Sequence, residues 1–200
     1  PSSPGAWIKL KESMEASWQA MVKSSYVRGH VFMEDCQIPD TIKKAFDMMI
    51  RIHGRDQWDP GASELVKATE ENIKIILEEK CESVKIAKQL PGILSPHELG
   101  FPEETVRELL VMLDLYILYV EMIEISAKAC YLAQYALDTV KPEAKHKALE
   151  VLPEIDNCIE NIMKRLDGTE YPHYIYWLLD ELRLKLLYRD IEEKMAALPD

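Results

Sequence analysis

A largely apolar segment, residues 109–137, contains four charged residues whose spacing could form a binding or catalytic site. Asp114, Glu121 and Lys128 follow one another at intervals of seven residues, which places them along one line of a helix. Glu124 lies one turn before Lys128 and is spaced to pair with it. A carboxylate buried in such a helix must be paired or carry a raised pKa, and in a cleft it can transfer protons or hold a ligand.

Two interpretations of these charges remain open from the sequence. They can form the single solvent-facing edge of an otherwise buried helix. Alternatively, the glutamates point into the protein and line a polar pocket together with tyrosines of the same segment. The residues expected to bind a ligand in that case are Glu121, Glu124, Tyr116, Tyr119 and Tyr131.

A second candidate surface is aromatic and lies near residue 172. On a helix, Tyr174, Trp177 and Glu181 share one face, which differs from the face that carries the leucines. Tyrosine and tryptophan combine an apolar ring with a polar group and are enriched at protein interfaces. This face is either a partner-binding patch or packs against a first helix that carries Trp7 and Trp18.

Metal and cofactor chemistry finds little support in the motifs. A di-iron bundle needs two E-x-x-H motifs on separate helices, and the chain has one, from Glu143 to His146. There is no G-x-S-x-G nucleophile motif and no glycine-rich phosphate loop. His30, Glu34 and Asp35 form a local cluster that is either an acid–base group or a polar surface loop. We therefore expect no metal and no cofactor.

The elements that must position these residues are helical. Neither glycine nor proline occurs in residues 62–90 or 103–141. Both residue types are costly inside helices, by roughly 1 and 3 kcal/mol relative to alanine. The sequence therefore predicts two long helices, the first ending at Pro91 and Gly92, and the second, at about 102–140, largely buried at the centre of the fold.

Apolar periodicity predicts the other helices. Their expected ranges are about 6–27, 40–53, 142–166 and 172–198. In the first, an apolar stripe is expected to face the core: Trp7, Leu10, Met14, Trp18 and Met21. Pro153 predicts a kink or a break in the fifth helix.

Short connections between consecutive helices favour antiparallel packing. The predicted fold is therefore an all-α, antiparallel up-down bundle of about six helices. We expect a single domain over residues 6–200, in which residues 6–53 are either integral or a partly separate packing unit. Residues 1–5 have the composition of a linker or a tag remnant.

Charge and cysteine content restrict partner and compartment. The formal net charge is −11 and no basic run is present, which argues against nucleic acid and anionic membrane surfaces as partners. The apolar runs are too short to cross a membrane. Cys36, Cys81, Cys130 and Cys158 lack metal-ligand spacing and indicate reduced, largely buried thiols in a cytoplasmic protein.

Two functions follow as hypotheses. The first is a helical interaction or scaffold module, an accessory or regulatory domain of a larger protein, whose partner is another protein, an adjacent domain or a second copy. It predicts an exposed apolar patch of several hundred Å². The second is an enzyme or a small-molecule-binding bundle, and it predicts that Glu121 or Glu124 is buried beside a cavity.

Overall fold

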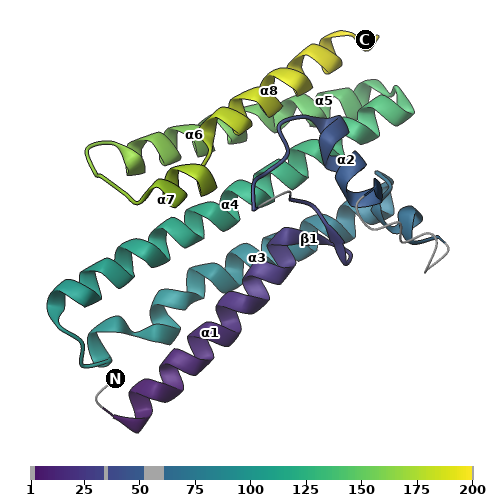
Figure 1. The fold of residues 1–200 in the computed structure, drawn as a ribbon. Helices are drawn as coiled ribbons and strands as arrows, with labels where there is room; N and C mark the ends of the chain where they lie inside the picture. The colour runs from purple at the N-terminus through teal and green to yellow at the C-terminus, as the bar shows by residue number, and fades with distance from the viewer. Residues whose placement is uncertain (1–2, 34–35, 52–60, 200) are drawn as a thin grey trace.

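The computed structural model describes residues 3–33, 36–51 and 61–199. Within these ranges the chain forms eight α-helices, two 3-10 helices and one two-stranded sheet. The long helices follow one another in alternating directions, as Figure 1 shows. The predicted all-α antiparallel bundle is confirmed.

The N-terminal part consists of a long helix, a small hairpin and a shorter helix. Helix α1 (Pro4–Ser25) leads directly into strands β1 (Tyr26–Val27) and β2 (His30–Val31), which pair antiparallel. Helix α2 (Ile42–Arg51) follows, and its expected end near residue 53 lies outside the described residues.

The first of the two predicted long helices is displaced toward the C-terminus. A 3-10 helix, η2 (Ala62–Val66), precedes α3 (Glu70–Leu94). Thr69 caps α3, because its hydroxyl accepts a hydrogen bond from the Asn72 amide at 3.2 Å. Pro91 lies inside the last turn and does not end the helix as expected. A proline this close to the end removes few backbone hydrogen bonds, and the chain turns only at Ser95, whose φ is 44°.

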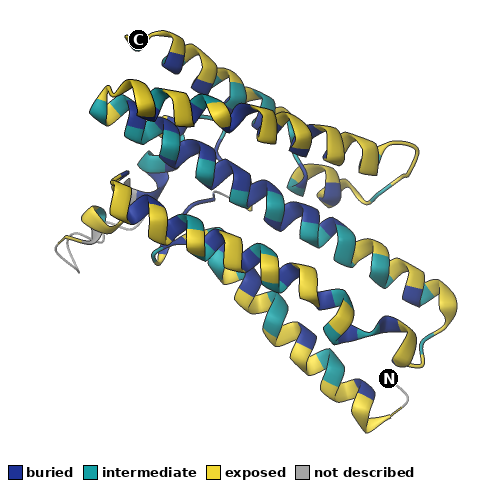
Figure 2. Cartoon of the chain, turned by 180° about the vertical axis from the view of Figure 1, so that it is seen from behind, coloured by how far each residue is buried: buried dark blue, intermediate teal, exposed yellow. Residues whose placement is uncertain are grey.

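Helix α4 (Glu103–Thr139), which follows the short 3-10 helix η3 (Pro96–Glu98), runs through the middle of the molecule. Figure 1 shows α1 and α3 on one side of it and α5, α6 and α8 on the other. Burial is concentrated between Leu115 and Ala136, whereas Val111 and Met112 nearer its start are exposed. The predicted central helix is therefore buried mainly along its second and third thirds (Figure 2).

Both of the last predicted helices are divided. The fifth breaks at Val151 into α5 (Pro142–Glu150) and α6 (Leu152–Leu166), and Pro153 occupies the first turn of α6, where a missing amide hydrogen costs little. The sixth is split into α7 (His173–Leu178) and α8 (Glu181–Ala196). The carboxylate of Asp180 begins α8 by accepting hydrogen bonds from two backbone amides, at 3.1 and 3.3 Å.

One apolar core joins most of these elements. Its buried residues come from the hairpin, α2 and every helix from α3 to α8. Smaller buried clusters lie between α1, α3 and α4, and Ala6 and Ala20 are the α1 residues buried in them. Helix α1 therefore packs against its neighbours through small side chains.

Candidate functional site

Helix α1 exposes the apolar stripe that its sequence pattern assigns to the core. Trp7, Met14 and Trp18 are 61%, 69% and 68% exposed. Ile8 and Val22 are exposed beside them, while Leu10 and Met21 are half-buried. The expectation that this stripe faces the core is wrong, and a set of large apolar side chains faces solvent instead.

Small residues form the buried face of α1. Ala6, Ser13, Ala20 and Ser24 are the residues of this helix that are buried. Short side chains allow the backbone of α1 to approach its neighbours closely. Two neighbouring hydroxyls use that approach: Ser83 of α3 donates to the carbonyl of Ala20 at 2.6 Å, and Tyr116 of α4 donates to the carbonyl of Ser17 at 2.7 Å.

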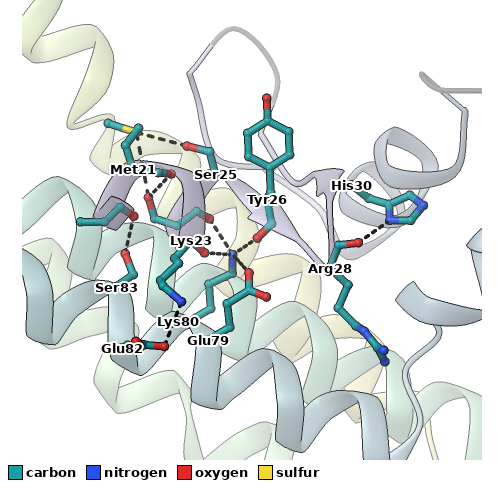
Figure 3. Close-up of polar contacts among 12 residues, drawn as sticks. Met21, Lys23, Ser25, Tyr26, Arg28, His30, Glu79, Lys80, Glu82 and Ser83 are labelled. Atoms are coloured by element: carbon teal, nitrogen blue, oxygen red, sulfur yellow. Dashed lines mark hydrogen bonds and ion pairs between the residues drawn. The ribbon is translucent and has the colours of Figure 1, made fainter. Parts of the chain in front are cut away.

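A buried lysine holds the C-terminal end of α1 (Figure 3). The ammonium of Lys80, on α3, donates to the backbone carbonyls of Lys23, Ser24 and Tyr26, the contact with Ser24 measuring 2.8 Å. The last carbonyls of a helix lack partners within the helix and carry its negative dipole end, so a cation suits them. The carboxylate of Glu79 adds an ion pair at 3.5 Å.

The environment of Lys80 defines its role. Its side chain is fully buried, and burial lowers its pKa to about 8. Lowered lysine pKa values occur at catalytic sites. Here, however, the amine is directed at backbone carbonyls and lines none of the cavities described below. Lys80 therefore fixes the orientation of α1, together with Ser83, Tyr116 and the Lys23–Glu82 ion pair at 2.9 Å.

The sequence itself carries a signal for this arrangement. The small residues of α1 recur at helical spacing, on a face adjacent to the tryptophans. A periodicity search ranks faces by hydrophobicity and therefore selects the tryptophan stripe. In this protein the face of alanine and serine is the buried one, and the opposing helix supplies Lys80 and Ser83 as donors to its backbone.

The aromatic residues of α7 are also largely exposed. Tyr174 is 51% and Trp177 is 39% exposed, and Trp7 and Trp18 do not bury them. Glu181, at the start of α8, is half-buried and pairs with Lys185 at 3.8 Å. The three residues of the predicted partner-binding patch therefore remain accessible to a partner in this structure.

An apolar cavity of about 270 Å³ connects α1 with α7. It lies between these helices and α4, and its lining includes Met21, Met112, Leu115, Tyr116, Tyr119 and Tyr174. The hydroxyl of Tyr119 donates to the Cys36 carbonyl at 2.7 Å. Burial raises the pKa of Tyr116 to about 12 and raises that of Tyr119 as well. Both phenols thus act as hydrogen-bond donors, and the cavity offers apolar surface.

Tyr131 is separate from the other predicted pocket residues. It is fully buried, its hydroxyl donates to the Val66 carbonyl at 3.1 Å, and its ring meets that of Phe46 at a centroid distance of 4.9 Å. Burial raises its pKa. These contacts attach η2 and α2 to α4. The structure therefore does not bring Tyr116, Tyr119 and Tyr131 together with the glutamates in one pocket.

Glu121 and Glu124 do line a cavity, of about 340 Å³, between α3, α4 and α6. Glu121 is ion-paired with Lys88 of α3 at 2.7 Å. Glu124 makes no hydrogen bond or ion pair with any described residue, and burial raises its pKa. Lys128 pairs with Glu154 of α6, at 2.6 Å, instead of with Glu124 as the spacing suggested.

The remaining charges of α4 also turn toward its neighbours. Asp114 pairs with Arg165 of α6. The charged line is therefore neither a free solvent edge nor a closed interior pocket, because Glu121 and Glu124 line a groove between α3 and α6 while Asp114 and Lys128 pair with residues of α6. Across the described parts of the chain, no three His, Cys, Asp or Glu side chains are grouped to hold a metal ion.

The other predicted ionisable clusters do not assemble into a site. His146 of α5 pairs with Glu150 at 3.1 Å on the exposed side of the helix. His30 approaches the Arg28 carbonyl at 3.3 Å, and Glu34 and Asp35 lie outside the described residues. The thiols are less buried than expected, since Cys36 and Cys81 are exposed and only Cys130 and Cys158 are buried.

Comparison of the chain with protein-family models, curated proteins and solved structures finds no match. Among the described helices, none is both long enough and apolar enough to span a membrane. The candidate functions rest on the exposed apolar side chains of α1 and on the groove lined by Glu121 and Glu124.

Proposed function

We propose that this chain is a helical interaction module that binds a protein partner through one face of α1. This α1 face consists of the exposed side chains of Trp7, Met14 and Trp18, with Leu10 and Met21 half-buried along its inner edge. The observation that carries the proposal is that a helix with a buried face of small residues presents its large apolar residues to solvent. Contiguous exposed apolar surface marks interaction sites.

The composition of the face supports recognition of a protein. Tryptophan side chains dominate the binding energy of many interfaces, and methionine adapts to an irregular partner surface. The aromatic residues Tyr174 and Trp177 of α7 extend the surface, because Tyr174 and Met21 line the same apolar cavity. Within this proposal the module is an accessory or regulatory domain and acts in the cytoplasm, since its four cysteines are free thiols.

The way α1 is attached also favours binding. Lys80, Ser83 and Tyr116 fix the backbone of α1 from its buried side. A partner that docks on the opposite side therefore meets side chains on an ordered helix, and little conformational entropy is lost on binding.

A photo-reactive amino acid placed at Met14 tests the proposal in cells that express the protein. We expect it to form a covalent adduct with a protein partner. The matched control is Gln19, which is exposed on the same helix but lies off the α1 face. Adducts of equal yield from both positions, or none from position 14, would contradict the proposal.

A second candidate function is the binding of a small cationic molecule in the groove of Glu121 and Glu124. It is favoured by the unpaired, half-buried Glu124 beside a cavity of about 340 Å³. Isothermal titration with spermidine tests it. Binding should weaken at least tenfold in Glu124→Gln and remain in Glu104→Gln, whose side chain is exposed near the start of α4. Absence of heat with wild-type protein removes this candidate.

A further inference from the structure

We propose that the occupant of the α1 face is a second copy of this chain, paired antiparallel through α1 about a two-fold axis at Met14. This inference rests on the proposed function and names its partner. Two-fold interfaces bring the same patch of both subunits together, so the patch must complement itself when it is reversed. The order of side chains along α1 meets that condition.

The register follows from the spacing of the apolar residues. Trp7 and Met21 each lie seven residues from Met14, so an antiparallel pairing centred there places Trp7 opposite Met21 of the second copy. Leu10 and Trp18 each lie four residues from Met14 and become opposite in the same way. Each tryptophan thus meets an unbranched or smaller aliphatic side chain, and two methionines meet at the axis.

The apolar cavity supports the same register. Met21 forms part of its lining, so Trp7 of the second copy lies over its edge. An aromatic anchor beside an apolar pocket is a common feature of binding hot spots. The symmetry provides this contact twice, once at each end of the paired helices.

Charges next to the stripe are complementary in this arrangement. Lys11 and Glu15 lie on the same flank of the stripe and form an ion pair at 3.7 Å within one copy. In the antiparallel register, Lys11 of one copy and Glu15 of the other are about 3 Å apart along the axis.

The area of the α1 face determines how tightly the dimer is expected to associate. Helix α1 has 22 residues and is therefore about 33 Å long, so one face of it buries roughly 300–400 Å² per copy. Standard stable interfaces bury about 800 Å² per partner. We therefore expect a reversible dimer with a dissociation constant on the order of micromolar.

Sedimentation velocity across a concentration series tests the dimer with the whole chain. Wild-type protein should shift from monomer to dimer as its concentration rises. Met14→Glu places two carboxylates at the axis and should weaken the dimer at least tenfold. The matched control, Gln19→Glu, adds the same charge to the same helix off the face and should leave the dimer unchanged. Equal effects of both variants would overturn the inference.

Disulfide trapping tests the register. In a chain carrying Cys36→Ser and Cys81→Ser, Met14→Cys should cross-link to itself under mild oxidation. Trp7→Cys and Met21→Cys should cross-link when mixed. Neither should do so alone, because each lies roughly 21 Å along the axis from its own copy. Self-cross-linking of Trp7→Cys would show a parallel pairing and overturn the proposal.

The two proposals fail in different ways. A chain that remains monomeric at every concentration rules out the second copy as the occupant. If the photo-reactive residue at position 14 then captures a different protein, the α1 face is still an interaction surface. If it captures nothing, both proposals are wrong.

Discussion

The ammonium nitrogen of Lys80 lies 2.8 Å from the carbonyl oxygen of Ser24, where α3 meets the end of α1. This contact joins a fully buried cation to backbone groups that a helix end leaves without partners. It holds the small-residue face of α1 toward the bundle and therefore leaves the tryptophans outside. The interaction surface depends on a residue that does not belong to it.

Replacement of Lys80 by methionine should destabilise the fold. The variant keeps most of the side-chain volume but leaves the carbonyls of Lys23, Ser24 and Tyr26 buried without their donor. We expect the free energy of unfolding, measured by urea denaturation with circular dichroism, to fall by about 3 kcal/mol. Lys85→Met, at an exposed position of α3, should change it by less than about 0.5 kcal/mol. Equal losses in the two variants would show that the contact of Lys80 with the carbonyls does not stabilise the fold.

The same lysine should make stability depend on alkaline pH. Burial lowers its pKa from 10.5 to about 8, so between these values the unfolded chain binds a proton that the folded chain has lost. The contribution of Lys80 to stability is therefore independent of pH below about pH 8 and increases as pH rises from about 8 toward 10.5. The difference in unfolding free energy between wild type and Lys80→Met should grow between pH 8 and 9.5. A difference that shrinks over this interval would contradict the assignment.

The exposed and buried faces of α1 should respond oppositely to substitution. Trp7→Gln combined with Trp18→Gln removes two large apolar side chains that are 61% and 68% exposed. We expect the midpoint of thermal unfolding to change little, corresponding to less than about 1 kcal/mol. Ala20→Leu adds volume where α1 approaches α3 and should cost about 1–3 kcal/mol. Calorimetry of both variants decides which face is packed, and a large loss in the tryptophan variant would restore the interpretation from the sequence.

Substitution of the two groove glutamates by glutamine should affect stability at pH 7 differently. Burial raises the pKa of Glu124, so the stability linked to this carboxyl is present below about pH 4.5 and is lost as pH rises through its folded pKa. Glu124→Gln should therefore be more stable than wild type at pH 7, by roughly 0.5–1 kcal/mol, with no gain at pH 4. Glu121→Gln loses the ion pair with Lys88 and should be neutral or slightly less stable at pH 7. Urea denaturation at both pH values measures these differences.

The amino-acid sequence determined the helices of this protein. Long stretches without glycine or proline predicted α4 and most of α3, and apolar periodicity predicted α1, α2 and the paired segments that became α5 to α8. For Glu121 and Glu124, which line a cavity in the structure, it left open whether they face solvent or a pocket. These properties are local, because they depend on backbone preference and on the order of side chains within one segment.

Only the tertiary structure decided which faces of these helices meet. Tyr116 and Tyr119 face an apolar cavity opposite the glutamates, Tyr131 is a core residue, and Lys128 pairs with Glu154 of another helix. The tryptophan stripe of α1 is outside because Lys80, Ser83 and Tyr116 bond to the backbone of its other face. A periodic pattern reports the hydrophobicity of a face, whereas burial also depends on what the neighbouring helices offer to it, and that information lies in distant parts of the chain.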